Sequence, residues 1–476
     1  MDSFTIPQGI TTIEARTFSG CDKLTNITIP NSVEKIGAGA FESCGFKSII
    51  IPENVKSIGY QAFVWCRELL SITLPNSLVE ISEYAFDECK SIEAVSAPAF
   101  VFPHIPKLKL KTAIVTCGET LSGFNGAQNL ENITLCDTII SMDVDSFSGC
   151  NLLRYNTKNN MNYLGSKTNP YLVAIHPTST SLTSLAIDEN SKIIYNQCFN
   201  YCTNLKSITI PDNIIEIGIG TFKGCNSLES IELPFIGIKA ALNNNDEQYP
   251  LGCIFGTVEY AGGVATIQYL KDSYGYTRST TFYIPTSLKK VSINGTKIPY
   301  GAFYNCKNII NIYIGNTINI VENDVFVGCE SLQYNIKDDI KYLGNLLNPY
   351  ILAVKGISSN ATEIILDNNC KIIYDSAFYN YTKVKQILLP NSVEKIGSSA
   401  FSYCSALEEI TIGEQVSSIG SYAFYNCNKL TKVVLSNTAG WKTNKNITIP
   451  EESLSNFLSA ANCLTSTYLG YSWIRS

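Results

Sequence analysis

The chain has 476 residues, of which 45% are hydrophobic, and a formal net charge of −6. This apolar fraction is ample for a packed core, and an elongated array of this length avoids the size limit on a single globular core. The charge, spread over this length, argues against nucleic acid as a partner, because phosphate binding needs concentrated lysine and arginine. No apolar run reaches the ~18 residues of a membrane helix, so membrane insertion is not expected.

A short repeat begins near the N-terminus. Phenylalanine stands at positions 18, 41, 63 and 86, and each is followed three residues later by a cysteine. Steps of 22 or 23 residues indicate a solenoid built from one unit laid down repeatedly.

Each unit opens with a short strand and then turns inward. In the copy that starts at Leu24, apolar residues nearly alternate until Pro30, which cannot donate to a strand ladder. Val33, Ile36 and Phe41 follow with the spacing of an inward-turning loop or a single helical turn. One unit has too little apolar surface for a core, but stacked units share one, with parallel strands about 4.8 Å apart.

Residues 97–146 are the least regular stretch, and we interpret them as degenerate coils of the same solenoid. They contain the only compact basic segment, Lys107, Lys109 and Lys111, whose alternation places all three on one strand face. A solvated face and an anion site are the two interpretations, and the solvated face is favoured.

A longer period lies above the short one. Landmark residues between 147 and 222 recur 179 positions later, between 326 and 401. Each half carries a segment, 155–175 or 334–354, with runs rich in Tyr, Leu and Val around a Gly-to-Asn-Pro turn. This pattern predicts a β-hairpin inserted in each half of the solenoid.

A larger insertion, residues 235–285, separates the two halves. Its aromatic and β-branched content predicts two or three extra strands rather than a disordered linker. Tyrosine gives much contact area for little lost entropy and is favoured at recognition hot spots. The alternative is that some of these rings pack inward against the solenoid. The candidate binding residues in this segment are Tyr249, Phe255, Tyr260, Tyr269, Tyr274, Tyr276 and Tyr283.

The outer face of the predicted sheet offers a second set of candidates. Positions between the inward residues of each strand point to this face, and they include Thr73, Thr209 and Tyr313. The row is mostly threonine and aliphatic with few charges. It therefore resembles ordinary sheet surface as much as a binding site.

The two ends of the chain differ. Phe4 to Pro7 enters the repeat without a polar cap, and an uncapped solenoid end leaves an open edge. We therefore expect a longer precursor with a leader or further coils. After Leu435 the repeat gives way to a polar stretch, a helix-like segment and a closing strand, which we expect to form a C-terminal cap.

These boundaries divide the chain into successive segments. Repeats are expected at 1–154, 176–234, 286–333 and 355–435, hairpin insertions at 155–175 and 334–354, the aromatic-rich insertion at 235–285 and the cap at 436–476.

Eleven of the 17 cysteines occupy one slot of the repeat. Equivalent slots in neighbouring coils stack about 5 Å apart with parallel Cβ directions, which does not favour a disulfide. We therefore expect a column of small, buried, free thiols. The pairing of Cys117, Cys136, Cys253, Cys370 and Cys463, which lie outside that slot, stays open.

Enzyme motifs are weak. The only two histidines, His104 and His176, lie outside any catalytic or metal-binding motif. The run from Gly218 to Gly224 misses the spacing of a dinucleotide fingerprint. Carboxylates are plentiful, but nothing in the sequence selects a pair for acid–base work. We expect no catalytic residue, no metal and no cofactor.

The repeat resembles a known family. IPNSVEKIGAGAFESC at 29–44 and LPNSVEKIGSSAFSYC at 389–404 match the repeat of BspA-like leucine-rich repeat proteins almost position for position. The resemblance covers nearly the whole chain. It implies an α/β repeat fold, a leucine-rich-repeat solenoid of about 22- to 23-residue coils with parallel strands.

The resemblance also implies a role. Members of this family are typically displayed on or secreted from bacterial or protist cells, and some bind host matrix proteins or other cells. It therefore implies a non-enzymatic adhesion or recognition protein, located extracellularly or at the cell surface, whose partner is a host extracellular protein or glycan. The alternative is a structural spacer that carries another module of a larger surface protein. We expect a monomer.

Overall fold

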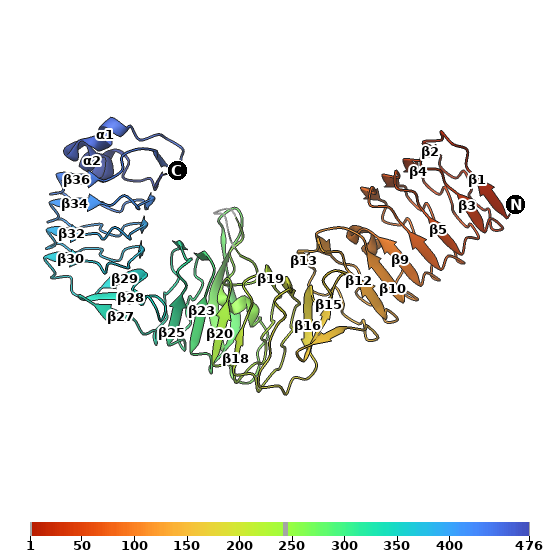
Figure 1. Ribbon diagram of the computed structural model, residues 1–476, viewed down its shortest axis with the longest axis horizontal. Helices are drawn as coiled ribbons and strands as arrows, with labels where there is room; N and C mark the ends of the chain where they lie inside the picture. The colour runs from red at the N-terminus through yellow and green to blue at the C-terminus, as the bar shows by residue number, and fades with distance from the viewer. Residues whose placement is uncertain (1, 241–245, 476) are drawn as a thin grey trace. The chain divides into compact units, whose positions relative to one another are not determined.

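The computed structural model describes residues 2–240 and 246–475. Residues 241–245, within the predicted insertion, lie outside the described residues. The chain divides into two compact units, Met1–Cys202 with Asn213–Lys223 (unit 1), and Thr203–Asp212 with Gly224–Ser476 (unit 2). Each unit is a stack of coils whose strands follow one another in chain order (Figure 1). The finer division into repeats, insertions and cap stays a prediction.

Most coils contribute a main strand of three or four residues, and most of these strands pair in parallel with the main strand of an adjacent coil. In unit 1 these are β1 (Ser3–Thr5), β3 (Asn26–Thr28), β5 (Ser48–Ile50), β7 (Ser71–Thr73), β9 (Ala94–Ala97), β10 (Thr112–Val115) and β12 (Asn132–Thr134). In unit 2 they are β18 (Ser207–Thr209), β20 (Ser230–Leu233), β23 (Lys290–Ile293), β25 (Asn311–Ile314), β30 (Glu363–Ile365), β32 (Gln386–Leu388), β34 (Glu409–Ile412) and β36 (Lys432–Leu435). The predicted parallel solenoid is confirmed.

The segment expected to be a loop or a helical turn contains a second, two-residue strand followed by turns. These short strands also pair in parallel from coil to coil. Unit 1 has β2 (Thr12–Ile13), β4 (Lys35–Ile36), β6 (Ser57–Ile58), β8 (Glu80–Ile81), β11 (Thr120–Leu121), β13 (Ser141–Met142), β17 (Ile193–Ile194) and β19 (Glu216–Ile217). Unit 2 has β24 (Lys297–Ile298), β26 (Ile320–Val321), β31 (Ile372–Ile373), β33 (Lys395–Ile396) and β35 (Ser418–Ile419).

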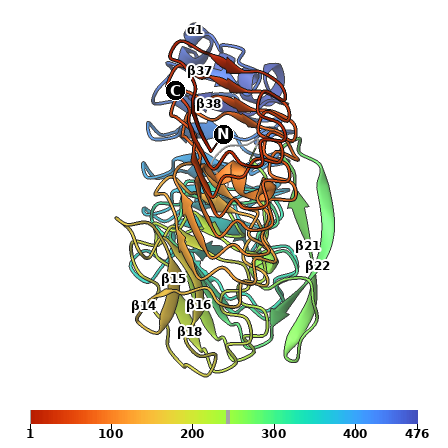
Figure 2. The ribbon, with the colours of Figure 1, turned by 90° about the vertical axis from the view of Figure 1, so that its right-hand side faces the viewer.

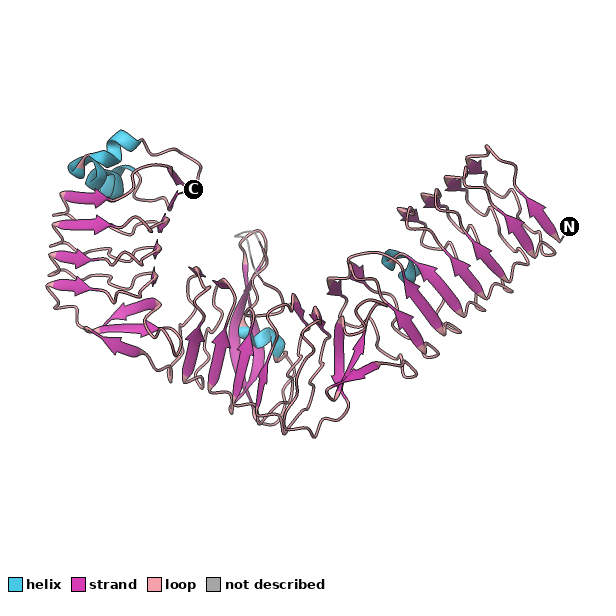
Figure 3. Cartoon of the chain, viewed as in Figure 1, coloured by secondary structure: helices cyan, strands magenta, loops and turns pink. Residues whose placement is uncertain are grey.

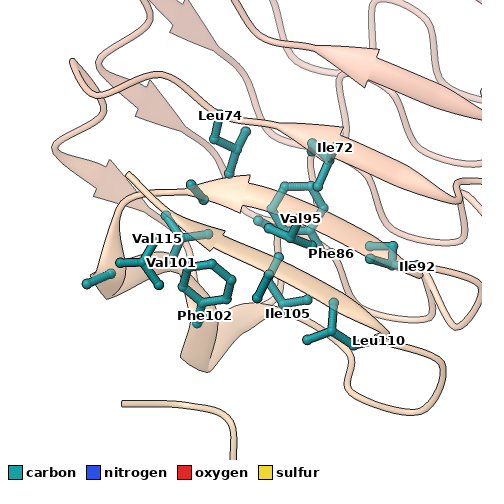
Figure 4. Packing of buried hydrophobic residues seen from close by; sticks show 14 of the residues in the cluster. Ile72, Leu74, Phe86, Ile92, Val95, Val101, Phe102, Ile105, Leu110 and Val115 are labelled. Carbon is teal, nitrogen blue, oxygen red and sulfur yellow. The ribbon is translucent and has the colours of Figure 1, made fainter. Parts of the chain in front are cut away.

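The repeating phenylalanines stack in the interior between the two strand columns. Phe41 and Phe63 are fully buried, and their ring centroids lie 5.2 Å apart in a stacked arrangement. This spacing is close to the separation of neighbouring strands, so one ring per coil fills the core without a gap. Figure 4 shows the same packing further along unit 1, where Phe86 and Phe102 lie among aliphatic side chains of successive coils.

The slot cysteines complete this interior as free thiols, as predicted. The thiol of Cys66 donates to the carbonyl of Phe41 at 3.1 Å, and Cys427 donates to Phe401 at 3.2 Å. Each bond reaches back to the preceding coil. Each of these carbonyls also accepts a backbone N–H of its own coil, from Cys44 and Cys404 respectively, so the thiol adds a second hydrogen bond that links adjacent coils. All the other cysteines are free as well.

The glycine of the repeated Ile-Gly pair permits close contact between coils. A Cβ added at Gly59 would lie 2.9 Å from the backbone nitrogen of Ala38 in the preceding coil. Contacts this short require a residue without a side chain.

Residues 97–146 form coils, which confirms the interpretation of that stretch. Strand β10 pairs in parallel with both β9 and β12, and the 3₁₀ helix η1 (Ala99–His104) replaces a usual turn segment. Phe102 and Phe124 take the core position, with ring centroids 4.7 Å apart.

An antiparallel three-stranded meander interrupts each unit at the predicted hairpins. The first comprises β14 (Asn156–Lys158), β15 (Met161–Leu164) and β16 (Val173–Pro177), and the second β27 (Asn335–Lys337), β28 (Ile340–Leu343) and β29 (Leu352–Gly356). The predicted hairpin corresponds to the last two strands of each meander, which flank the Gly-to-Asn-Pro turn. The structure adds a third strand, β14 or β27, before them. The last strand of each meander pairs in parallel with the next short strand, so the solenoid resumes.

The larger insertion forms an antiparallel hairpin of β21 (Gly263–Lys271) and β22 (Thr277–Pro285), preceded by the 3₁₀ helix η2 (Leu251–Ile254). Main strands β20 and β23, on either side of it in sequence, pair directly with each other. The insertion therefore leaves the ladder between these two coils intact.

The C-terminal residues cover the last coil of unit 2. They comprise β37 (Trp441–Thr443), α1 (Glu451–Ser455), α2 (Phe457–Asn462), the π-helix η3 (Cys463–Thr467) and β38 (Trp473–Arg475). Trp441 and Trp473 are buried in the same core cluster as Leu435 of the last main strand. Among the described residues the α-helices α1 and α2 lie at this end, and the helices that Figure 3 draws elsewhere are the 3₁₀ helices η1 and η2.

Candidate recognition site

The tip of the β21–β22 hairpin carries the most exposed aromatic side chains of the insertion. Tyr274 is 86% exposed and Tyr276 is 75% exposed. Figure 2 shows β21 and β22 as a long two-stranded ribbon along the side of their unit. Two large rings thus stand in solvent at the end of this ribbon.

The backbone of the tip is held in one conformation. The carboxylate of Asp272 accepts hydrogen bonds from the backbone N–H of Tyr274 at 3.0 Å and of Tyr276 at 2.8 Å. Gly275 has a φ of 90°, in the left-handed region that favours glycine, and its N–H donates to the Asp272 carbonyl. A loop fixed in this way loses little backbone entropy when a partner contacts its tyrosines.

The middle of the hairpin is anchored to the repeat by a buried glutamine. The side-chain oxygen of Gln268 accepts from the N–H of Gly252 at 2.8 Å, and its amide donates to the Tyr304 carbonyl at 2.9 Å. Phe282, on β22, is buried against Gly252. Both strands are therefore held within the hairpin's length, and Lys271, the last residue of β21, also exchanges backbone hydrogen bonds with Gln248.

The other candidate aromatics of the insertion take different positions, which corrects part of the expectation. Phe255 is 0% exposed and Tyr260 is 7% exposed, with its hydroxyl donating to the Tyr283 carbonyl at 2.7 Å. These two rings pack inward, as the alternative interpretation held, and they are buried like the apolar residues of η2. They offer no surface to a partner.

Tyr249 and Tyr269 are half-buried. The Tyr249 hydroxyl donates to the carboxylate of Glu247. The ring of Tyr269 meets that of Tyr304 edge to face, with centroids 5.0 Å apart. Only part of each ring is therefore available at the surface.

The sheet-face candidates are not brought together into one patch. Thr73 is exposed on β7 of unit 1, whereas Thr209 and Tyr313 belong to unit 2. By register, Thr209 and Tyr313 lie in one row, with Glu232 and Ser292 between them. The ring of Tyr313 is covered by Lys290, whose Nζ lies 4.7 Å from its centroid. The contacts on this face are those of an ordinary exposed sheet surface, and they do not single out a binding site.

A row of tyrosines in unit 2 was not selected from the sequence. Tyr379 is 50% exposed, and its ring meets Tyr403 at 5.3 Å; Tyr403 meets Tyr425 at 5.3 Å, and Tyr425 meets Tyr422 at 6.0 Å. The row runs across successive coils on their turn side. A sequence signal was present, because tyrosine follows the core phenylalanine by one or two positions in each of these coils.

Groups suited to chemistry are sparse. Within residues 2–240 and 246–475, no set of three or more His, Cys, Asp or Glu side chains is placed to hold a metal ion. His176 packs edge to face against Tyr155 at 5.0 Å, and His104 contacts a backbone carbonyl, so each has a structural contact. Across the same described ranges, no helix is both long and apolar enough to cross a membrane.

Comparison with known proteins identifies the repeat. The family described as BspA type leucine rich repeat region matches residues 1–106, 99–169, 177–244, 265–347 and 357–461. A comparison with curated proteins found no match.

Solved structures include similar chains. A leucine-rich repeat protein from Bacteroides ovatus is 21% identical over 86% of this chain and 72% of that chain, with a TM-score of 0.21. A leucine-rich cell surface protein from Faecalibacterium prausnitzii is 20% identical over 92% of this chain and 88% of that chain, with a TM-score of 0.20. TM-scores this low carry no inference about this chain.

Proposed function

Because this chain belongs to the BspA-type leucine-rich repeat family, we propose that it is a non-enzymatic recognition protein, displayed on or secreted from the cell, that binds a host extracellular protein or glycan. The observation that carries this proposal is the pair of exposed tyrosines, Tyr274 and Tyr276, on a hairpin whose strands are anchored by Gln268 and whose tip is fixed by Asp272.

The physical support for this site is its preorganisation. Exposed tyrosines provide apolar contact area and a hydroxyl that can donate or accept a hydrogen bond. A tip already held by Asp272 adds little ordering penalty on binding. Two exposed rings have no packing role at the tip, so their stabilising contribution to the fold is small.

The test is binding of the purified chain to immobilised fibronectin, fibrinogen, mucin and a glycan panel. The variant Tyr274→Ser/Tyr276→Ser removes both rings, and Tyr60→Ser/Tyr84→Ser is the matched control because it removes an exposed tyrosine pair from unit 1. We expect saturable binding that falls at least tenfold in the tip variant and is unchanged in the control.

Other results would redirect the proposal. Equal binding by both variants would refute the tip as the site and direct attention to the tyrosine row, which Tyr379→Ser/Tyr403→Ser would then test. Failure of every variant and of the parent chain to bind would instead favour a spacer solenoid.

A further inference from the structure

Each unit contains a gap where its meander interrupts the ladder of short strands. In unit 1, β13 is the edge of the two-stranded sheet β11–β13, and the next short strands, β17 and β19, belong to the sheet of the meander. In unit 2, β26 is the corresponding edge of the sheet β24–β26, and β31 and β33 belong to the sheet of the second meander. An unpaired strand edge presents backbone donors and acceptors that need partners.

In unit 1 a carboxylate closes the gap. Glu216, buried at the start of β19, accepts hydrogen bonds from the hydroxyl of Ser141 at 2.8 Å and from the backbone N–H of Met142 at 3.1 Å. The contact spans 74 and 75 residues of sequence, across the whole meander. Asn196 adds a second bridge by donating to the Val144 carbonyl at 2.9 Å.

In unit 2 the residues at the same positions of the 179-residue period are different. Ile320 and Val321 stand for Ser141 and Met142, and Lys395 stands where Glu216 would be expected. An ammonium group cannot accept a hydrogen bond from a backbone N–H. The side chain that covers the strand edge in unit 1 therefore has no equivalent over β26.

A groove occupies this position in unit 2. Its volume is about 440 Å³, and it is lined by residues of β26, β31, β33, β35 and β38. Lys395 and Arg475 are among the lining residues, and the Arg475 guanidinium also donates to the Glu414 carbonyl. Serine and asparagine side chains supply most of the remaining polar lining.

The charges in the groove favour an anionic group. Glu322 is paired with Lys297 at 2.9 Å, and the lysine side chain is only 4% exposed, so this carboxylate is neutralised. Neither Lys395 nor Arg475 takes part in an ion pair within the described part of the chain. The one opposing group is Asp375, whose carboxylate accepts from the Ser398 N–H at 2.6 Å.

We propose that this groove binds an extended peptide segment, whose main chain pairs with the open edge of β26 and whose acidic side chain takes the position that Glu216 holds in unit 1. Addition of a strand to an exposed sheet edge is an established mode of peptide recognition, with main-chain bonds giving affinity and side-chain sites giving specificity. Lys395 supplies a charge-assisted hydrogen bond to the incoming carboxylate. In unit 1 the carboxylate position of this arrangement is filled by the chain's own Glu216.

The proposal is independent of the hairpin tip. None of the groove residues belongs to β21, β22 or the turn between them. The tip variant Tyr274→Ser/Tyr276→Ser should therefore bind the peptide as the parent chain does. If the binding test of one site gives a negative result, the proposal for the other site is unaffected.

The experiment uses the full chain and a fluorescein-labelled blocked peptide, acetyl-Thr-Val-Glu-Val-Thr-amide, followed by fluorescence polarisation. The matched probe replaces the central Glu with Gln, and free glucuronate is the non-peptide competitor. We expect saturable binding of the acidic peptide, at least tenfold weaker binding of the Gln peptide, and no displacement by glucuronate at tenfold molar excess over the peptide.

Two variants assign the binding to the groove. Lys395→Glu installs the residue that unit 1 carries and should abolish binding, and Lys395→Met removes the charge without adding a carboxylate and should weaken binding at least tenfold. Circular dichroism verifies that both variants are folded. Absence of binding by the parent chain up to millimolar peptide, equal binding of both peptides, displacement by glucuronate, or unchanged binding by either variant would each overturn the proposal.

Discussion

Replacing Asp375 by asparagine should stabilise unit 2. Burial, with smaller contributions from the nearby Glu322 and Asp324, raises the pKa of the Asp375 carboxyl from its ordinary value of 3.8 to about 6. A folded state that disfavours the ionised carboxylate is destabilised at neutral pH. Asn196, the equivalent residue of unit 1, bridges its gap with an uncharged amide instead.

The magnitude follows from the pKa difference. At about 1.4 kcal/mol per pKa unit, a rise from 3.8 to about 6 corresponds to roughly 3 kcal/mol for complete burial. Because the side chain is partly exposed, solvent screening reduces this to about 1–2 kcal/mol. Asparagine also keeps the acceptor for the Ser398 N–H, so that hydrogen bond is preserved.

The stabilisation should depend on pH in a defined direction. Below about pH 4 the carboxyl is protonated in both the folded and the unfolded state. The only remaining difference is that between a neutral carboxylic acid and an amide, so the variant and the parent should have nearly equal unfolding free energies. Between about pH 4 and 6 the unfolded state loses its proton and the folded state keeps it, so the parent loses stability as pH rises. Above about pH 6 the full difference should be present.

Urea unfolding followed by tryptophan fluorescence measures this difference, because Trp441 and Trp473 are buried in unit 2. The matched control is Asn196→Asp in unit 1, which should destabilise that unit, as followed by circular dichroism. A variant that is no more stable than the parent at pH 7, or one whose advantage is the same at pH 4 and pH 7, would refute the reasoning.

Three further outcomes are expected. Glu216→Ala should lower the unfolding free energy of unit 1 by about 1–3 kcal/mol, because the Met142 N–H loses its acceptor; a change under about 0.5 kcal/mol in urea unfolding would contradict this. Gly59→Ala should destabilise by about 1–3 kcal/mol, since the new Cβ would lie 2.9 Å from a backbone nitrogen of the preceding coil; an unchanged Tm would argue against that contact. Burial raises the pKa of the Cys404 thiol to about 12, so iodoacetamide at pH 8 should label the partly exposed Cys136 well before Cys404. Because the cysteines are free thiols, dithiothreitol should leave the Tm unchanged. A reductant-sensitive Tm would reveal a disulfide.

The amino-acid sequence by itself determined the repeat and most of what stacks inside it. The period of the phenylalanines and cysteines predicted a parallel solenoid, free core thiols and coils of about 22 to 23 residues, and the structure confirms these features. The physical reason is that each coil contacts mainly its neighbours, so the environment of one repeat position is the same along the array. A regular period therefore carries tertiary information directly.

The tertiary structure alone decided which residues of the insertion face solvent. Phe255 and Tyr274 belong to the same aromatic-rich segment, yet one is fully buried and the other is almost fully exposed. The difference depends on how η2 and the hairpin lie on the repeat, which is fixed by side chains such as Gln268 whose partners are 36 and 38 residues away. No local pattern encodes such contacts.

The groove of unit 2 likewise needed the structure. The exchange of Glu216 for Lys395 is visible in the sequence as one difference between two related halves. Its consequence is not visible there, because the bond from Glu216 to Ser141 crosses a meander and joins residues 75 positions apart. Repeats fix contacts between adjacent coils, whereas an insertion brings non-adjacent coils together, and only the folded chain shows which side chains then meet.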